Sequence, residues 1–208
     1  MGMDSSDAKS SNASGSKRRI RFLTQEEAEK LLSELPPHLA DMARFSLETG
    51  LRRANVLDLQ WTQVDLVRRC AWIHSDQAEA RKAIAVPLSP TAVVIVRGQT
   101  GKCQTHVFSH KGKPVTNMNT KAWRVALKRA GIQDFRWHDL RHTWASWHHA
   151  QAGTPLNVLQ KLGGWESVVM VRRYAHLSGE HLSEYARSMT GGLRPVALKR
   201  LRSKGFGE

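Results

Sequence analysis

The stretch FRWHDLRHTWASWHHA, residues 135–150, decides how we interpret this chain, because it holds four of the ten histidines together with three tryptophans. On a helix of about 100° per residue, apolar and polar side chains fall on two separate arcs. The arc predicted to be buried contains Leu140, Thr143, Trp144 and Trp147. The arc predicted to face away from the core contains His138, Arg141, His142 and His149. We therefore expect a cationic strip along one side of this helix.

Three interpretations of the strip are open. His138 and His142 have the i, i+4 spacing of zinc-binding helices, but Arg141 between them would repel a divalent cation. Alternatively, the Arg141 guanidinium presents a fork of donors that matches two phosphate oxygens, to which His138 adds a third donor. The third interpretation is a solvated basic face without a specific ligand. Evidence from the rest of the chain has to decide among them.

Composition favours a polyanionic partner. The 208 residues include 32 Lys and Arg against 18 Asp and Glu, a formal charge of +14 and a pI near 10.5. Such a chain suits nucleic acid, because binding releases counterions condensed on the phosphates, although an anionic membrane surface would attract the same charge. No apolar run reaches the length of a membrane span and no signal peptide is visible, so we expect a soluble, cytoplasmic protein that does not enter membranes. The two cysteines are expected to be reduced.

The segments along the chain indicate one mainly helical domain. Residues 1–17 are polar and Ser-rich, and we interpret them as a flexible leader or a cloning remnant. The pair Thr24 and Glu27 forms a capping-box pattern at the first predicted helix. Alternating segments QVDLVRRCAWIH and KAIAVPLS predict short antiparallel strands, and helical patterns dominate from residue 117 onward. The predicted fold class is α+β, mainly α-helical with a small antiparallel sheet.

Three motifs, in order, carry a resemblance to a known family. HDLRH resembles the His-x-x-Arg motif of the tyrosine recombinases, the phage integrase family of site-specific DNA recombinases. LETGLRRANVLDLQW resembles the first arginine motif of that family, with Arg52 in the arginine position. VLQKLGGWESVVMVRRYAHL resembles the last motif, in which Trp165 precedes Tyr174 by nine residues. The resemblance covers roughly residues 22–188.

The resemblance implies the catalytic-domain fold of this family and a set of site residues. Tyr174 would attack the scissile DNA phosphate and form a 3′-phosphotyrosyl intermediate, with strand exchange and religation afterwards. Arg52, Arg141 and His138 would stabilise the charge that gathers on the phosphate, and Trp165 would donate a hydrogen bond to it. His138 is also the expected acceptor of the phenol proton. Neither ATP, a metal ion nor any other cofactor is implied.

The residues beside the nucleophile lead to two further expectations. Tyr174 follows Arg172 and Arg173, whose charges we expect to lower its pKa. The chain has one other tyrosine, Tyr185, which we interpret as a packing residue on a C-terminal helix.

The leaving-group acid is where the sequence departs from the family pattern. The family places a lysine on the turn between the second and third strands, where it protonates the leaving 5′ oxygen. Counting back from Pro87, that position holds Glu79, and the nearest lysine is Lys82. A carboxylate beside a phosphate would repel it, so either Lys82 replaces the usual lysine through a shifted turn or protonation is impaired.

The domain limits and partners also follow from the resemblance. We assign residues 18–190 to the catalytic domain and residues 191–208 to a basic C-terminal tail, with the chain an isolated or truncated catalytic domain. The expected partner is double-stranded DNA at attachment sites, bound by a homotetramer of the full-length protein with DNA-bending accessory proteins, in the nucleoid of a bacterial cell. Two other functions stay open, a non-catalytic DNA-binding module and a type IB topoisomerase-like enzyme.

Overall fold

The structure is a computed structural model that describes residues 21–78 and 82–177. The leader, the C-terminal tail, Glu79 and Tyr185 lie outside these residues. The helical elements are α1 (Gln25–Glu34), α2 (Pro37–Thr49), α3 (Arg53–Leu57), the 3₁₀ turn η1 (Trp61–Gln63), α4 (Pro90–Arg97), α5 (Lys121–Ala130), α6 (Asp139–Ser146), the π-helical segment η2 (Trp147–Gln151), α7 (Leu156–Gly163), α8 (Val168–Val171) and the 3₁₀ segment η3 (Arg172–Leu177). The strands are β1 (Val64–Asp65), β2 (Cys70–Ile73), β3 (Ile84–Pro87), β4 (Ser109–His110) and β5 (Lys113–Pro114). The predicted mainly helical α+β class is confirmed.

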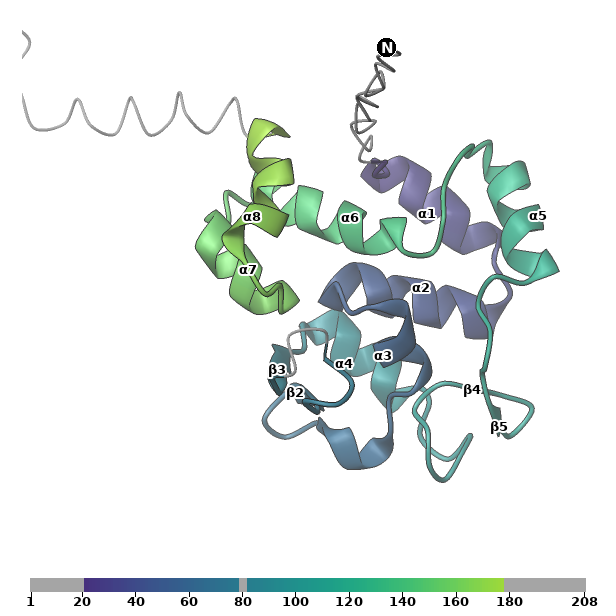
Figure 1. Cartoon of the computed structure of the whole chain (residues 1–208). Helices are drawn as coiled ribbons and strands as arrows, with labels where there is room; N and C mark the ends of the chain where they lie inside the picture. Colours follow the sequence, from purple (N-terminus) through teal and green to yellow (C-terminus); the bar gives the residue numbers. More distant parts are fainter. Residues whose placement is uncertain (1–20, 79–81, 178–208) are drawn as a thin grey trace, which may run out of the picture.

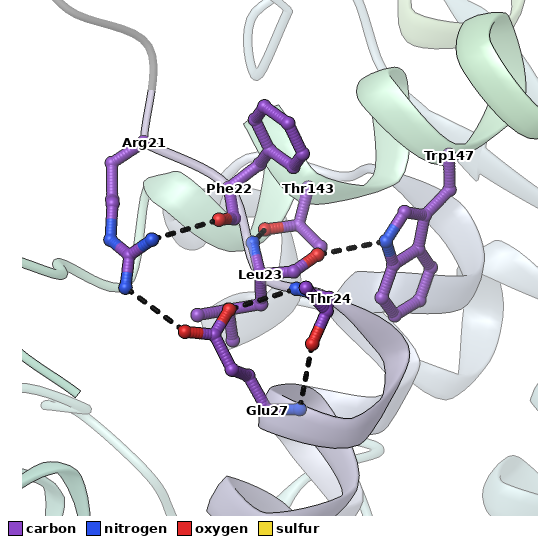
Figure 2. Close-up of polar contacts among 7 residues, drawn as sticks. All are labelled: Arg21, Phe22, Leu23, Thr24, Glu27, Thr143 and Trp147. Carbon is purple, nitrogen blue, oxygen red and sulfur yellow. Dashed lines mark hydrogen bonds and ion pairs between the residues drawn. The ribbon is translucent and has the colours of Figure 1, made fainter. Parts of the chain in front are cut away.

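The start of the described chain anchors the helix that carries HDLRH. Thr24 and Glu27 form the predicted capping box at α1, with hydrogen bonds of 3.1 and 2.9 Å (Figure 2). The preceding residue, Leu23, donates its backbone N–H to Thr143 Oγ1 at 3.1 Å. Trp147 Nε1 donates to the Leu23 carbonyl at 2.9 Å, so Leu23 alone is hydrogen-bonded to both α6 and η2 (Figure 2). Because these groups are largely out of water, the bonds fix the position of α6 along the chain start.

Helix α2 is the centre of the core. It begins at Pro37, where proline is tolerated because the first N–H needs no helical partner, and it ends at Gly50 in the left-handed conformation. It packs against α1, α4 and α6, and Figure 1 shows α6 alongside it. A Cβ at Gly50 would lie 2.3 Å from Trp144 Cε3, so glycine permits the close approach of α2 and α6 as well as its φ of 62°.

The predicted strands form one small antiparallel sheet in the order β1-β2-β3. The register pairs Ala71 with Val86 and Ile73 with Ile84, which places the buried apolar side chains of β2 against those of β3. Helix α4 follows, with the Ser89 side chain accepting from the Ala92 N–H as its N-cap and Pro90 at its first position. Strand β3 packs against α7, and its first residue, Ile84, lies against Gly164 of the last motif. Both cysteines are free.

None of the described helices is long and apolar enough to cross a membrane.

Candidate active site

Arg141 lies in the interior, contrary to the prediction that it faces away from the core. Arg141 is only 4% exposed. The guanidinium donates from Nη1 to the Gly50 carbonyl at 2.5 Å and from Nη2 to the Gly163 carbonyl at 2.6 Å. Burial, with a smaller effect of the Arg52 charge, lowers the Arg141 pKa to about 9, which leaves the group charged at neutral pH. Leu140, Thr143 and Trp144 are buried as predicted, so α6 is buried on two sides.

The two carbonyls that accept from Arg141 come from the other two motifs. Gly50 ends α2 and directly precedes the segment with Arg52, whereas Gly163 ends α7 and precedes Trp165 by two residues. Arg141 therefore joins segments that are more than 100 residues apart in the sequence. The three motifs quoted above meet at this guanidinium.

Trp165 contacts both Arg141 and Tyr174. The Arg141 Cζ lies 4.0 Å from the centroid of the Trp165 ring, a cation–π contact. The centroid of the Tyr174 ring lies 5.9 Å from that of Trp165, and Trp144 stacks on Trp165 at 6.0 Å. The half-buried indole thus packs against both the arginine and the tyrosine.

Tyr174 is buried and is bonded to a histidine. Its side chain is 0% exposed, and its Oη lies 2.6 Å from His142 Nδ1. Burial raises the Tyr174 pKa to about 12, although the charges of Arg141 and Arg173 act in the opposite direction. The prediction that neighbouring arginines lower this pKa is therefore wrong in its net sign, because desolvation of the phenolate outweighs them.

His142 is neutral at physiological pH. Burial, followed by the positive charges of His138, Arg173 and Arg141, lowers the His142 pKa to about 4. The sequence analysis considered His142 only as a zinc partner of His138 and gave it no catalytic role. The histidine spacing in HDLRH was the only available signal, and the contact with Tyr174 spans 32 residues.

His138 and Arg52 lie near Arg141. His138 is exposed at the start of α6, and its ring meets the His142 ring edge-on with centroids 5.1 Å apart. Although part of the residue is exposed, desolvation of the ring by its neighbours lowers the pKa of His138, and the charges of Arg141 and Arg52 add to this effect. Arg52 is half-buried at the N-terminus of α3, where burial lowers its pKa. Since the charge of Arg52 acts on both other groups, the three predicted cations lie close together.

Lys82 is exposed just before β3. Two residues later, Ile84 packs so closely on Gly164 that a Cβ there would lie 2.2 Å from Ile84 Cδ1. Gly164 immediately precedes Trp165, so Lys82 lies at the end of the sheet that adjoins the site. Glu79, at the lysine position of the family, is outside the described residues, and which of the two positions faces a phosphate stays a prediction.

The interpretation of the His138 and His142 pair as a zinc site gains no support from the geometry. Among the described residues, no three side chains of His, Cys, Asp or Glu gather around a common point. The Nδ1 atom of His142 is occupied by the Tyr174 hydroxyl.

Known protein sequences are similar to this chain over most of its length. The model of the phage integrase family matches residues 21–181. The integrase of Salmonella phage P22 is 48% identical over 185 residues, which cover 83% of this chain and 48% of that integrase. The shufflon-specific DNA recombinase of Escherichia coli is 29% identical over 79% of this chain and 41% of that protein. This chain thus spans about half the length of the P22 integrase and somewhat less than half of the shufflon recombinase.

Solved structures show the same fold at low identity. The catalytic domain of bacteriophage HP1 integrase superposes with a TM-score of 0.62 at 24% identity, over 85% of this chain and 100% of that domain. A lambda integrase dimer bound to a COC' core site superposes with a TM-score of 0.66 at 18% identity, over 81% of this chain and 64% of that one. The fold is therefore that of a tyrosine recombinase catalytic domain, and the chain, matched by the family model over most of its length, belongs to the phage integrase family.

Proposed function

We propose that this chain is the catalytic domain of a site-specific DNA recombinase in which Tyr174 attacks the scissile phosphate and becomes linked to the DNA 3′ end. The observation that carries the proposal is the meeting of Arg141, from HDLRH, with Trp165 and Tyr174 of the last motif, in which the indole contacts both other side chains. A phenol next to a charged guanidinium is the arrangement that phosphoryl transfer requires, since the transition state gathers negative charge on the nonbridging oxygens.

The phosphate would be held by Arg52, Arg141 and His138, with Trp165 as a further donor through its indole N–H. Two N–H groups of Arg141 already donate to carbonyls, which leaves three of its five donors for a ligand. These bonds hold the guanidinium in one orientation before DNA arrives. Preorganised charge of this kind lowers the barrier without reorganisation during the reaction.

The leaving 5′ oxygen needs a proton, and Lys82 is the proposed donor. It is exposed at the sheet end that adjoins Trp165 through the contact of Ile84 with Gly164. The covalent link to Tyr174 conserves the energy of the broken bond, so a 5′ hydroxyl of a second strand can reverse the step without ATP or a metal. Strand exchange and religation follow from the same chemistry.

Cleavage would require Tyr174 and Arg141 to become accessible, since both are buried in the described structure. We infer that binding of DNA displaces the Trp165 ring from Arg141 and opens the site to a phosphate, while η3 stays against α6. The lambda integrase that this fold resembles is a dimer bound to a core site. On that basis we infer double-stranded attachment sites as partners, with assembly into a tetramer of the full-length protein. Accessory proteins that bend DNA complete the proposed complex.

A nicked suicide substrate that carries the attachment core of the parent element tests the proposal. Cleavage releases a short fragment that carries the new 5′ hydroxyl, so the covalent complex cannot reverse and is stable to denaturation by detergent. We expect the wild-type chain to form this complex and Tyr174→Phe to form none, whereas Tyr185→Phe serves as the matched control and links normally. A Tyr174→Phe variant that still links to DNA, or a folded wild-type chain that binds this DNA but never links, would exclude the proposed chemistry.

A further inference from the structure

We propose that His142 is the group that accepts the proton of the Tyr174 hydroxyl when the tyrosine attacks phosphorus. This inference rests on the proposed function and assigns a residue to one step of it. Its basis is geometric: His142 Nδ1 lies 2.6 Å from Tyr174 Oη, within hydrogen-bond distance, and the centroids of the two rings are 6.0 Å apart.

The resting protonation states allow this direction of transfer, and because the pKa is about 12 for Tyr174 and about 4 for His142, the proton moves only as the bond from Tyr174 Oη to phosphorus forms. A neutral imidazole has one nitrogen that accepts, and burial together with the nearby His138, Arg173 and Arg141 keeps His142 neutral. The Tyr174 hydroxyl is itself neutral and fully buried, so it carries a proton to donate. With Nε2 protonated, His142 Nδ1 is the acceptor and the phenol is the donor.

His138 is less well placed for the same task. Its ring meets His142 rather than Tyr174, with an edge-on contact at 5.1 Å. It is exposed, whereas His142 is half-buried and Tyr174 is fully buried. The three rings thus run from the surface to the nucleophile, and His138 is at the end where a phosphate and solvent arrive. We therefore keep His138 as a phosphate donor and assign the phenol proton to His142.

The step balances as follows. The Tyr174 Oη–P bond forms as the P–O5′ bond breaks, and the phenol proton moves to His142 Nδ1, which becomes an imidazolium. The leaving 5′ oxygen takes its proton from the proposed acid, Lys82. On religation the imidazolium returns its proton to the tyrosine oxygen, so His142 is restored after each cycle.

Single-turnover cleavage of the suicide substrate tests this assignment. General base catalysis contributes about 10²–10⁴-fold, so His142→Ala is expected to slow covalent complex formation by about 10²-fold or more with little change in DNA affinity. His142→Phe keeps a ring against Tyr174 and His138 but cannot accept a proton, and it should be equally slow. The matched control is His149→Ala, which removes a half-buried histidine bonded to the Thr154 carbonyl, and its rate should stay near that of the wild type.

Two further measurements separate proton transfer from structural support. Added imidazole should restore part of the rate of His142→Ala, because it can occupy the vacated space and accept the proton, but should not restore His142→Phe. A substrate with a 5′-bridging sulfur needs no protonation of its leaving group, so it should leave both variants slow.

The outcomes distinguish the inference from the proposed function. If the wild-type chain links to DNA through Tyr174 while folded His142→Phe cleaves at the wild-type rate or faster, the assignment of His142 is wrong and the proposed function stands. Rescue of the His142 variants by the bridging sulfur would place the defect at the leaving group and also overturn the assignment. If the wild-type chain never links to DNA, both the function and the inference fail.

Discussion

Substitution of Gly163 by alanine tests the packing that joins Trp165 to Arg141. Gly163 is the last residue of α7, and a Cβ added there would lie 2.0 Å from Trp165 Cζ3 and 2.4 Å from Cε3. These contacts are too short to persist, so the indole has to shift. Overpacking of this kind costs about 1–3 kcal/mol, and replacing a helical glycine with alanine returns roughly 0.5–1 kcal/mol. We expect a net loss of about 1–2 kcal/mol in the free energy of unfolding.

The matched control is Gly98→Ala. Gly98 ends α4 in a right-handed helical conformation, and the nearest atom to its added Cβ is the Ile95 carbonyl oxygen at 3.4 Å. This variant should be as stable as the wild type or slightly more stable. Urea unfolding followed by tryptophan fluorescence measures both, and near-UV circular dichroism reports the shift of Trp165. If Gly163→Ala were as stable as Gly98→Ala with an unchanged near-UV spectrum, the close packing of Trp165 on α7 would be refuted.

Two further predictions concern titration and the leaving group. The folded-state pKa of His142 lies below the unfolded value of 6.5, so the native state binds fewer protons. The free energy of unfolding should therefore fall as pH drops from 6.5 to about 4, by up to roughly 3 kcal/mol. Urea midpoints should follow this fall, and most of this pH dependence should disappear in His142→Phe. The folded-state pKa of Tyr174 lies above its usual value, so stability should fall again from pH 10 to about 12, more weakly in Tyr174→Phe. Lys82→Ala should slow cleavage by about 10²-fold, and a 5′-bridging sulfur should restore it; a slow variant that sulfur does not restore would show that Lys82 is not the acid.

The parts of the fold that depend on neighbouring residues could be predicted from the sequence. The capping box of Thr24 and Glu27, the Ser89 cap and the strand alternation before Pro87 involve residues a few positions apart, and all three are present. Their geometry follows from local hydrogen bonding and side-chain periodicity.

The environment of Arg141 could not be predicted in the same way. A helical projection assumes one buried face, whereas α6 packs on α2 at one side and on η3 at another. The second contact belongs to a separate apolar cluster that includes Trp144, Leu159 and Tyr174. This cluster forms only when residues far apart in the sequence meet. The sign of the Tyr174 pKa shift could not be predicted for the same reason, because the neighbouring charges are visible in the sequence and the burial is not.

The partners of Arg141 explain how a buried cation can serve a phosphate. Removing the partner of a buried charge is strongly destabilising, so a site that must open cannot rely on an ion pair that opening would break. Here the guanidinium donates to two neutral carbonyls of the backbone, at Gly50 and Gly163. The groups that cover it include the Trp165 ring, held by a cation–π contact and apolar packing. An arriving phosphate would therefore displace ring contacts without competing with a carboxylate for the guanidinium, and the carbonyls would keep Arg141 oriented in both states.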